Sequence, residues 1–179
     1  MLVKNKVRYD MNYKYTALDV ANYIVWYVNT NQLGVVTPLK LQKILYYITT
    51  TYLQNHDKLL FEENFEKWQY GPVVTEVYHT FKSYGFSPIS APKPKFVKTS
   101  SNTLSIKKIE FDENQFDNDK EFKDLANNVI SELIHESAFA LVNKTHEESA
   151  WSKFEKEIMA GKKDLFYSKD ELKVAQKII

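Results

Sequence analysis

The stretch "TPLKLQKILYYITTTYLQN", residues 37–55, carries the strongest helix signal in the chain. Thr37 suits the N-cap position, and Pro38 suits the first helical position, where a missing N–H group costs nothing. Apolar side chains then recur with the period of one buried helix face; they are Leu41, Ile44, Leu45, Ile48 and Tyr52. Because consecutive threonines weaken a helix, we expect packing against neighbouring elements to hold this one.

The other side of this predicted helix carries polar and aromatic residues. Lys40, Lys43, Tyr47 and Gln54 are expected to project from it, away from the core. Lysines interleaved with tyrosines are also typical of nucleic-acid binding. The net charge is only +1, which gives little general attraction to phosphate. The sequence therefore argues against a nucleic-acid partner and favours a solvated face.

A second helix is predicted just before this one, in "TALDVANYIVWYVNTN", residues 16–31. Thr16 is a suitable N-cap, and Asp19 three residues later favours the positive end of a helix. The segment is apolar on two faces, which is typical of a helix between two layers. Gly34 is expected to mark its carboxyl end.

The segment "FEKWQYGPVV", residues 65–74, raises the question of why two large aromatics precede a Gly-Pro step. A short strand is predicted over 65–69. Pro72 is then expected to begin a helix over 72–85, with four residues facing inward: Val74, Val77, Tyr78 and Phe81. Trp68 and Tyr70 either pack behind the start of this helix or form a surface that holds a partner; the common use of large aromatics favours packing.

The rest of the chain completes a mainly α fold. A small hairpin is predicted within the proline-containing segment 86–118. A helix is predicted over 119–137, with a core stripe of Phe122, Leu125, Val129 and Leu133. Further helices are predicted over 138–146 after Ser137, over 148–161 ending at Gly161, and over 168–179 with Ser168 and Glu171 in capping-box spacing. We expect a compact single helical domain over 16–179 with a small β element, the insertion 86–118 included. Residues 1–15 are expected to form a flexible basic arm.

Composition excludes several classes of function. The chain has no cysteine, which rules out a disulfide scaffold, a cysteine-based zinc site and a cysteine nucleophile. It has only four glycines and no phosphate-binding loop motif. No signal peptide is recognisable, and no stretch approaches the roughly 20 apolar residues of a membrane-spanning helix. We therefore expect a cytoplasmic protein without a cofactor.

Two Glu-x-x-His pairs are candidates for a metal site, because such pairs build dinuclear centres in helical bundles. They are Glu76 with His79 and Glu132 with His135. On helical wheels neither pair converges inward, so the pattern argues against a metal. No G-x-S-x-G elbow supports a catalytic triad, and we expect His146 to be structural, beside Trp151. The sequence predicts that the protein is not an enzyme.

Three segments, "ALDVANYIVWYVN…TPLKLQKILYYI", "FEKWQYGPVVTEVYHTFKSYG" and "THEESAWSKF", occur in this order over about residues 16–160. Together they resemble the Panacea-domain family of SocA-like and GepA-like bacterial and phage proteins. The resemblance implies a compact helical fold, no catalytic residues, and an antitoxin that neutralises a cognate protein toxin by direct contact. Some relatives deliver the toxin to a host protease. The alternative is a phage or mobile-element protein that binds a host factor without a cognate toxin.

The resemblance also implies which residues belong to the family motif. The candidates are Lys40, Gln42, Lys43 and Tyr47, then Trp68, Tyr70, Gly71, Pro72 and Tyr78, and finally Thr145, His146, Glu147 and Trp151. Relatives often have proline where Thr75 and Ala150 stand here, and both positions are expected near helix starts. We expect the motif mainly to form a frame, while the arm, the segment 86–118 and exposed tyrosines contact the partner.

Overall fold

The computed structural model describes residues 13–98 and 106–179. Most of the predicted basic arm, residues 1–12, and the tip of the predicted hairpin, residues 99–105, lie outside the described residues. The described part is mainly α-helical, with two small antiparallel strand pairs. The predicted fold class is therefore confirmed.

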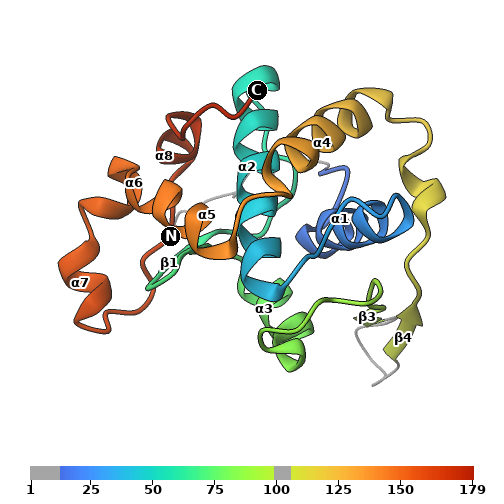
Figure 1. Ribbon diagram of the computed structural model, residues 1–179, viewed down its shortest axis with the longest axis horizontal. Coiled ribbons are helices and arrows are strands. Elements are labelled where there is room, and N and C mark those ends of the chain that lie inside the picture. The colour runs from blue at the N-terminus through green and yellow to red at the C-terminus, as the bar shows by residue number, and fades with distance from the viewer. Residues whose placement is uncertain (1–12, 99–105) are drawn as a thin grey trace, which may run out of the picture.

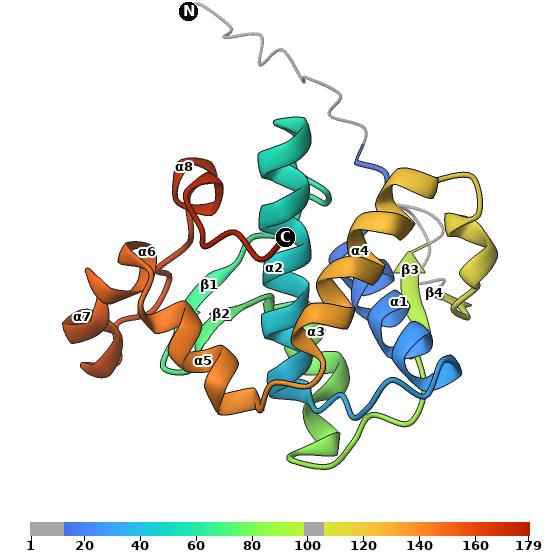
Figure 2. The same ribbon diagram turned by 45° about the horizontal axis from the view of Figure 1, so that its top comes forward.

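Helix α2 (Pro38–His56) is the centre of the molecule. Figures 1 and 2 show α1 (Ala17–Thr30) and α4 (Lys120–Leu133) on one side of it. On the other side lie α5 (Ala138–His146) and the hairpin of β1 (Glu66–Trp68) and β2 (Gly71–Val73). Four of the five residues predicted for its buried face are fully buried: Leu41, Ile44, Leu45 and Ile48. Tyr52 is only partly buried and packs against the edge of the core.

Three of the predicted helix starts are confirmed by their hydrogen bonds. The Thr16 side chain accepts from the Asp19 N–H, and Asp19 in turn accepts from the Thr16 N–H, so a full capping box begins α1. The Thr37 hydroxyl accepts from the Lys40 N–H at the start of α2. A second capping box joins Ser168 and Glu171 at the start of α8 (Lys169–Lys173). These bonds satisfy N–H groups that the first turn of a helix leaves without partners.

The expected carboxyl end of the first helix is wrong. Helix α1 ends at Thr30, four residues before Gly34. The Asn31 side chain donates to the Tyr27 carbonyl at 2.8 Å, so it satisfies one of the carbonyls that a glycine cap would otherwise serve. Gly34 lies in the following loop and packs against Ile134.

Helix α1 is covered on both sides, as its two apolar faces predict. It contacts α2, α4 and the short helix α3 (Thr75–Phe81). Tyr23 lies within a cluster of aromatic rings with Phe116 and Phe122, at centroid distances of 4.8 and 5.3 Å. The Tyr23 hydroxyl donates to the Asn127 side chain at 2.8 Å, so its polar atom is satisfied at the edge of the core.

The Gly-Pro step forms a hairpin and does not begin a helix. Strand β1 (Glu66–Trp68) pairs antiparallel with β2 (Gly71–Val73), with Lys67 opposite Pro72. The predicted strand is confirmed, whereas the predicted helix over 72–85 is wrong. Helix α3 covers only Thr75–Phe81, followed by a 3₁₀ turn, Lys82–Tyr84.

The chain stays extended through Val74 because side chains of α2 hold its backbone there, as described below. In this short helix Val77 and Phe81 face inward, as does Val74 just before it. Tyr78 was predicted to face inward with them, which is wrong: it is 37% exposed and packs edge-on against Trp68, with ring centroids 4.9 Å apart. A helix of so few turns buries only a narrow stripe of side chains against the core, and Tyr78 lies at the edge of that stripe.

The segment 86–118 contains the predicted hairpin, strand β3 (Lys95–Lys98) paired antiparallel with β4 (Ile106–Ile109). The Asn22 side chain holds the chain in front of β3 through two hydrogen bonds to the Lys93 backbone, at 2.8 and 2.9 Å. A 3₁₀ turn, Glu113–Phe116, leads to α4. The predicted core stripe of α4 is confirmed as buried: Phe122, Leu125, Val129 and Leu133.

The carboxyl-terminal part differs from its prediction in two places. The last predicted helix, over 168–179, is wrong in its length, because α8 ends at Lys173. Helix α5 begins after Ser137 as expected, but the single helix predicted over 148–161 is two, α6 (Ser149–Ser152) and α7 (Glu155–Met159). The break lies at Phe154, whose ring receives the Lys67 ammonium at 4.1 Å. Beyond α7 the chain returns beside β1, where Lys67 donates its N–H to the Leu165 carbonyl.

Within residues 13–98 and 106–179, none of the helices combines the length and the hydropathy that crossing a bilayer requires.

Candidate functional site

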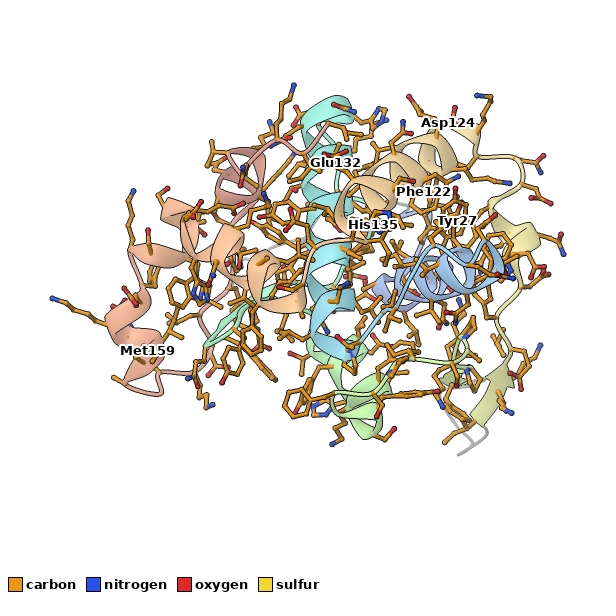
Figure 3. All side chains as sticks on the ribbon, in the orientation of Figure 1. Tyr27, Phe122, Asp124, Glu132, His135 and Met159 are labelled. Atoms are coloured by element: carbon orange, nitrogen blue, oxygen red, sulfur yellow. The ribbon has the colours of Figure 1, made fainter. Side chains whose placement is uncertain are left out.

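The two Glu-x-x-His pairs do not form a site. Glu76 and His79 on α3 are exposed, and so are Glu132 and His135 at the end of α4 (Figure 3). Among the described residues, no group of three or more His, Asp or Glu side chains is arranged to hold a metal ion.

The motif residues of α2 instead hold the β1–β2 hairpin. The Gln42 side chain accepts from the Val74 N–H at 2.9 Å and donates to the Val74 carbonyl at 3.2 Å. It thus satisfies both backbone groups of Val74, as a neighbouring strand would. Gln42 is 4% exposed, so these groups have little access to water, and leaving them unpaired would cost about 1–3 kcal/mol each.

Lys43 lies beside Gln42 and is fully buried, with 0% exposure. Its Nζ donates to the Pro72 carbonyl at 2.9 Å. Burial lowers the pKa of Lys43 to about 7, because desolvation disfavours the charged form and no carboxylate among the described residues pairs with this ammonium.

The predicted outward position of Lys43 and Tyr47 is wrong, since Tyr47 is also fully buried. Helix α2 contacts α5, β2 and α8 on the side that the sequence assigned to solvent, so this helix has no outward face along its middle turns. These two side chains are therefore unable to reach a nucleic acid.

Gly71 is the point where three motif segments meet. Its φ of +87° lies in a region that other residues rarely adopt. A Cβ atom at this position would lie 2.5 Å from the Thr145 Oγ1 and 3.1 Å from the Lys43 Nζ. Only glycine fits here, because side chains of α2 and α5 occupy the space next to the hairpin that the Cβ of any other residue would need.

A second buried polar group joins α2 to the carboxyl-terminal segment. Tyr46 donates to Glu148 at 2.6 Å, and Tyr47 donates to the other carboxylate oxygen at 3.2 Å. The Gln176 N–H also donates to Glu148, at 3.1 Å. Burial raises the pKa of Glu148, opposed by these hydrogen bonds. Burial and the nearby carboxylate raise the pKa of both tyrosines, so their hydroxyls remain donors.

We expect Tyr46→Phe to lower the free energy of unfolding by about 2 kcal/mol, because it removes a short hydrogen bond to a charged acceptor. Tyr47→Phe, which removes the longer bond, is expected to cost less. Urea denaturation of both variants measures the difference. Equal losses in the two variants would contradict the larger contribution expected of the shorter bond.

The last motif segment packs onto the first strand. Trp151 donates its indole N–H to the Trp68 carbonyl at 2.9 Å. His146 stacks on Trp151, with ring centroids 3.5 Å apart and planes 10° from parallel, which places it beside Trp151 as the sequence predicts. Burial lowers the pKa of His146, and the positive charge of Lys43 lowers it further, so the ring is favoured in its neutral, stacking form.

A groove with a volume of about 740 Å³ lies beside this frame. Its walls come from the start of α2, the β1–β2 hairpin, α3, the start of α5 and the chain from α7 to Leu165. Large apolar side chains gather on it with much of their surface in solvent: Tyr70 is 49%, Phe139 56% and Met159 60% exposed. Met159 lies at the outer end of α7 (Figure 3). Tyr70 and Phe139 pack edge to face, with centroids 6.0 Å apart.

The predicted motif residues differ in how much of their surface the fold buries. Seven are buried in the frame: Gln42, Lys43, Tyr47, Gly71, Pro72, Thr145 and Trp151. Lys40 and His146 are half-buried, and the Lys40 Nζ donates to the Ile134 carbonyl at 2.8 Å. Those that reach solvent on the groove are Trp68, Tyr70 and Tyr78, whereas Glu147 is exposed outside it.

The two positions where relatives often have proline lie at helix starts, as expected. Thr75 is the first residue of α3, and Ala150 is the second residue of α6. Thr75 donates its hydroxyl to Glu66 at 2.6 Å, a contact that proline lacks.

Three large residues of the groove were not predicted: Phe86, Phe139 and Met159. Phe139 could have been found, because it lies off the buried stripe of Leu141, Val142 and Thr145 on α5. Phe86 and Met159 lie in or beside short irregular segments, whose side-chain directions have no periodic signal in the sequence.

One comparison with known proteins gives a match that covers most of the predicted motif residues. The sequence model of the family described as "Antitoxin SocA-like, Panacea domain" matches residues 41–152, which include α2 from Leu41 onward, the β1–β2 hairpin and most of the motif at the end of α5. Neither the curated proteins nor the solved structures gave a match. The match covers more than half of the chain, and the protein therefore belongs to the SocA-like, Panacea-domain family of antitoxin-like proteins.

Proposed function

We propose that this protein is the antitoxin of a toxin–antitoxin pair, and that it neutralises a cognate protein toxin in the cytoplasm by binding it in the groove beside the β1–β2 hairpin. The observation that carries the proposal is the collection of exposed aromatic and apolar side chains on a groove whose walls are held by buried motif residues. Membership of an antitoxin-like family supports a protein as the partner.

The polar residues of the site support binding without catalysis. Gln42, Lys43 and Glu148 use their polar atoms in hydrogen bonds that hold the backbone or other buried groups. A catalytic group needs to lie within hydrogen-bond reach of a substrate, and these groups face inward. Their role in the proposal is to fix the groove's shape, which lowers the entropic cost of binding.

The energetics of protein interfaces favour the groove as the contact. A few large aromatic side chains usually supply most of the binding energy, especially where they lie near the centre of an interface. Tyr70 and Phe139 form such a pair: their rings pack edge to face, and about half of each side chain is exposed and available to a partner. An interface of ordinary size buries about 1,600 Å² in total, so the groove would form its centre and surrounding residues its rim.

The test is to express the neighbouring gene alone and together with this protein. We expect the neighbour to arrest growth alone, and wild-type protein to restore growth. The double variant Tyr70→Ala and Phe139→Ala is expected to lose the rescue, since losses of about 2 kcal/mol or more per anchor weaken binding by roughly three orders of magnitude. Co-purification of the two proteins measures the same loss directly.

A matched control lies on the β3–β4 hairpin, where Phe96 and Ile106 are also exposed. The double variant Phe96→Ala and Ile106→Ala is expected to retain the rescue. If the hairpin variant loses it and the groove variant keeps it, the groove is not the toxin-binding site. If the neighbouring product is harmless alone, or remains toxic with this protein, the antitoxin assignment is wrong; a host protein captured instead would indicate a host-factor binder.

A further inference from the structure

Three polar side chains on the walls of the groove, Gln42, Glu66 and Lys67, are already used by the fold. Glu66 accepts from the Trp68 indole and the Thr75 hydroxyl, at 2.9 and 2.6 Å. The Lys67 ammonium donates to Glu171 and to the Phe166 carbonyl, both at 2.9 Å. Gln42 is bonded to Val74. A small-molecule site usually presents a few converging polar groups, whereas this groove presents apolar side chains.

The rim of the groove adds a positive charge. Lys82, Lys162 and Lys163 line it and are exposed, and Asp164 is the one exposed acidic residue among the lining residues, all of which the structure describes. Lys162 lies 3.6 Å from Glu157. Within residues 13–98 and 106–179, Lys82 and Lys163 form no ion pair. Two lysines on the rim are thus open to acidic groups of a partner.

The backbone of the hairpin is closed to a partner strand. On the β2 edge, Gln42 takes both backbone groups of Val74, and Lys43 takes the Pro72 carbonyl. On the β1 edge, the chain around Leu165 and Tyr167 completes the pairing. Because addition of a strand needs a free edge, a partner in this groove is recognised through side chains. A helix satisfies its own backbone and offers side chains alone.

We propose that the groove takes an amphipathic helix with acidic side chains, contributed by the bound toxin; this inference rests on the proposed function. The apolar face of the helix packs on Tyr70, Phe139 and Met159. Glutamate or aspartate on its flank lies toward Lys82 and Lys163. The rim lysines set which partner is accepted, because charges at the edge of an interface act more on selectivity and association rate than on the strength of a well-packed centre.

The probe is a pair of synthetic helical peptides of roughly 18 residues, about 27 Å long at the helical rise. Both have the same leucine stripe; one carries glutamates on its flanks and the other lysines. With the full-length protein, fluorescence anisotropy is expected to show about tenfold tighter binding of the acidic peptide at low salt. The preference is expected to shrink as salt rises, because exposed charges are screened. Equal affinities, a preference for the basic peptide, or no binding of the acidic one would overturn the proposal.

The variant Lys82→Glu with Lys163→Glu is expected to abolish or reverse the preference. Lys58→Glu with Lys107→Glu makes the same change of charge at exposed positions outside the groove, and is expected to leave the preference unchanged. An equal loss in both variants would mean that general charge explains the binding, and the proposal would be wrong. Circular dichroism shows whether each variant is folded.

This result is separable from the test of the antitoxin role. If the charge-reversal variant still rescues growth and Tyr70→Ala with Phe139→Ala does not, the groove binds the toxin but the acidic helix is wrong. If rescue fails for the wild type, the proposed function is wrong whichever peptide binds. Self-association of the free protein that Tyr70→Ala abolishes would show that a second copy fills the groove, which would also overturn the inference.

Discussion

Replacing Gly71 by alanine is expected to lower the free energy of unfolding by about 3 kcal/mol. A left-handed backbone conformation costs a non-glycine residue about 1–2 kcal/mol, and overpacking a filled site typically costs 1–3 kcal/mol. Both apply here, since φ is +87° and the new Cβ would lie 2.5 Å from the Thr145 Oγ1. Because Gly71 joins the hairpin to α2 and α5, the loss would also disturb the groove that these elements shape. Urea denaturation followed by circular dichroism measures the change.

Gly161→Ala is the matched control. Gly161 has a φ of +82°, close to that of Gly71, but no atom lies within 4 Å of the position that a Cβ would take there. The free energy of unfolding of this control should therefore fall only by the cost of the left-handed backbone conformation, about 1 kcal/mol. A second control adds Thr145→Ala to Gly71→Ala, which removes the nearest atom and should recover part of the loss. If the two glycine variants are equally destabilised, steric contact at Gly71 adds nothing to the loss of stability. The close approach of the three segments would then not be the reason that this position requires glycine.

The free energy of unfolding of the wild type is expected to rise with pH above pH 7 because of Lys43, and Lys43→Met is expected to remove this rise. The pKa of Lys43 is about 7 in the folded protein, against an ordinary value of 10.5. Between these values the unfolded chain holds a proton that the folded protein has released, so unfolding takes up a proton and becomes less favourable as pH rises. The stability of the wild type relative to the variant should increase by up to about 1.4 kcal/mol per pH unit. The total gain from pH 7 to pH 9.5 is on the order of 3 kcal/mol.

The measurement is the free energy of unfolding of both proteins at several pH values in that window. The difference between them isolates Lys43, because every other titrating group is shared. Lys58→Met changes a lysine that is exposed, and its curve should run parallel to that of the wild type. A constant difference between wild type and Lys43→Met across the window would contradict the burial of a lone ammonium at this position.

The sequence alone determined the local elements of this fold. Thr16 with Asp19, Thr37 with Pro38, and Ser168 with Glu171 each begin a helix where predicted. These signals act within one turn, between residues at most three positions apart, so they need no knowledge of the rest of the chain. The stripe of α4, the hairpin in 86–118 and the family assignment were also accessible in this way.

The tertiary structure decided which faces are buried and therefore where the candidate site lies. Lys43 and Tyr47 have the polarity and spacing of a solvated face, yet they are buried because α5, β2 and α8 close around α2. Tyr78 has the position of a core residue in a long helix but is exposed on a short one. Pro72 has the signature of a helix start, but Lys43 holds its carbonyl and Gln42 holds the backbone of Val74 in extended form.

The physical reason is the difference in range between the interactions. Helix caps and periodicity join neighbours in the chain, whereas the contacts that shape the groove join residues about 30 to 100 positions apart, such as Gln42 with Val74 and Tyr46 with Glu148. Periodicity states that a helix has two faces, but only the packing of other segments determines whether the second face meets water. The sequence thus determined the helices and the family, and the packing around α2 decided that most of the motif is a frame and that Tyr70, Tyr78 and Phe139 form the exposed surface.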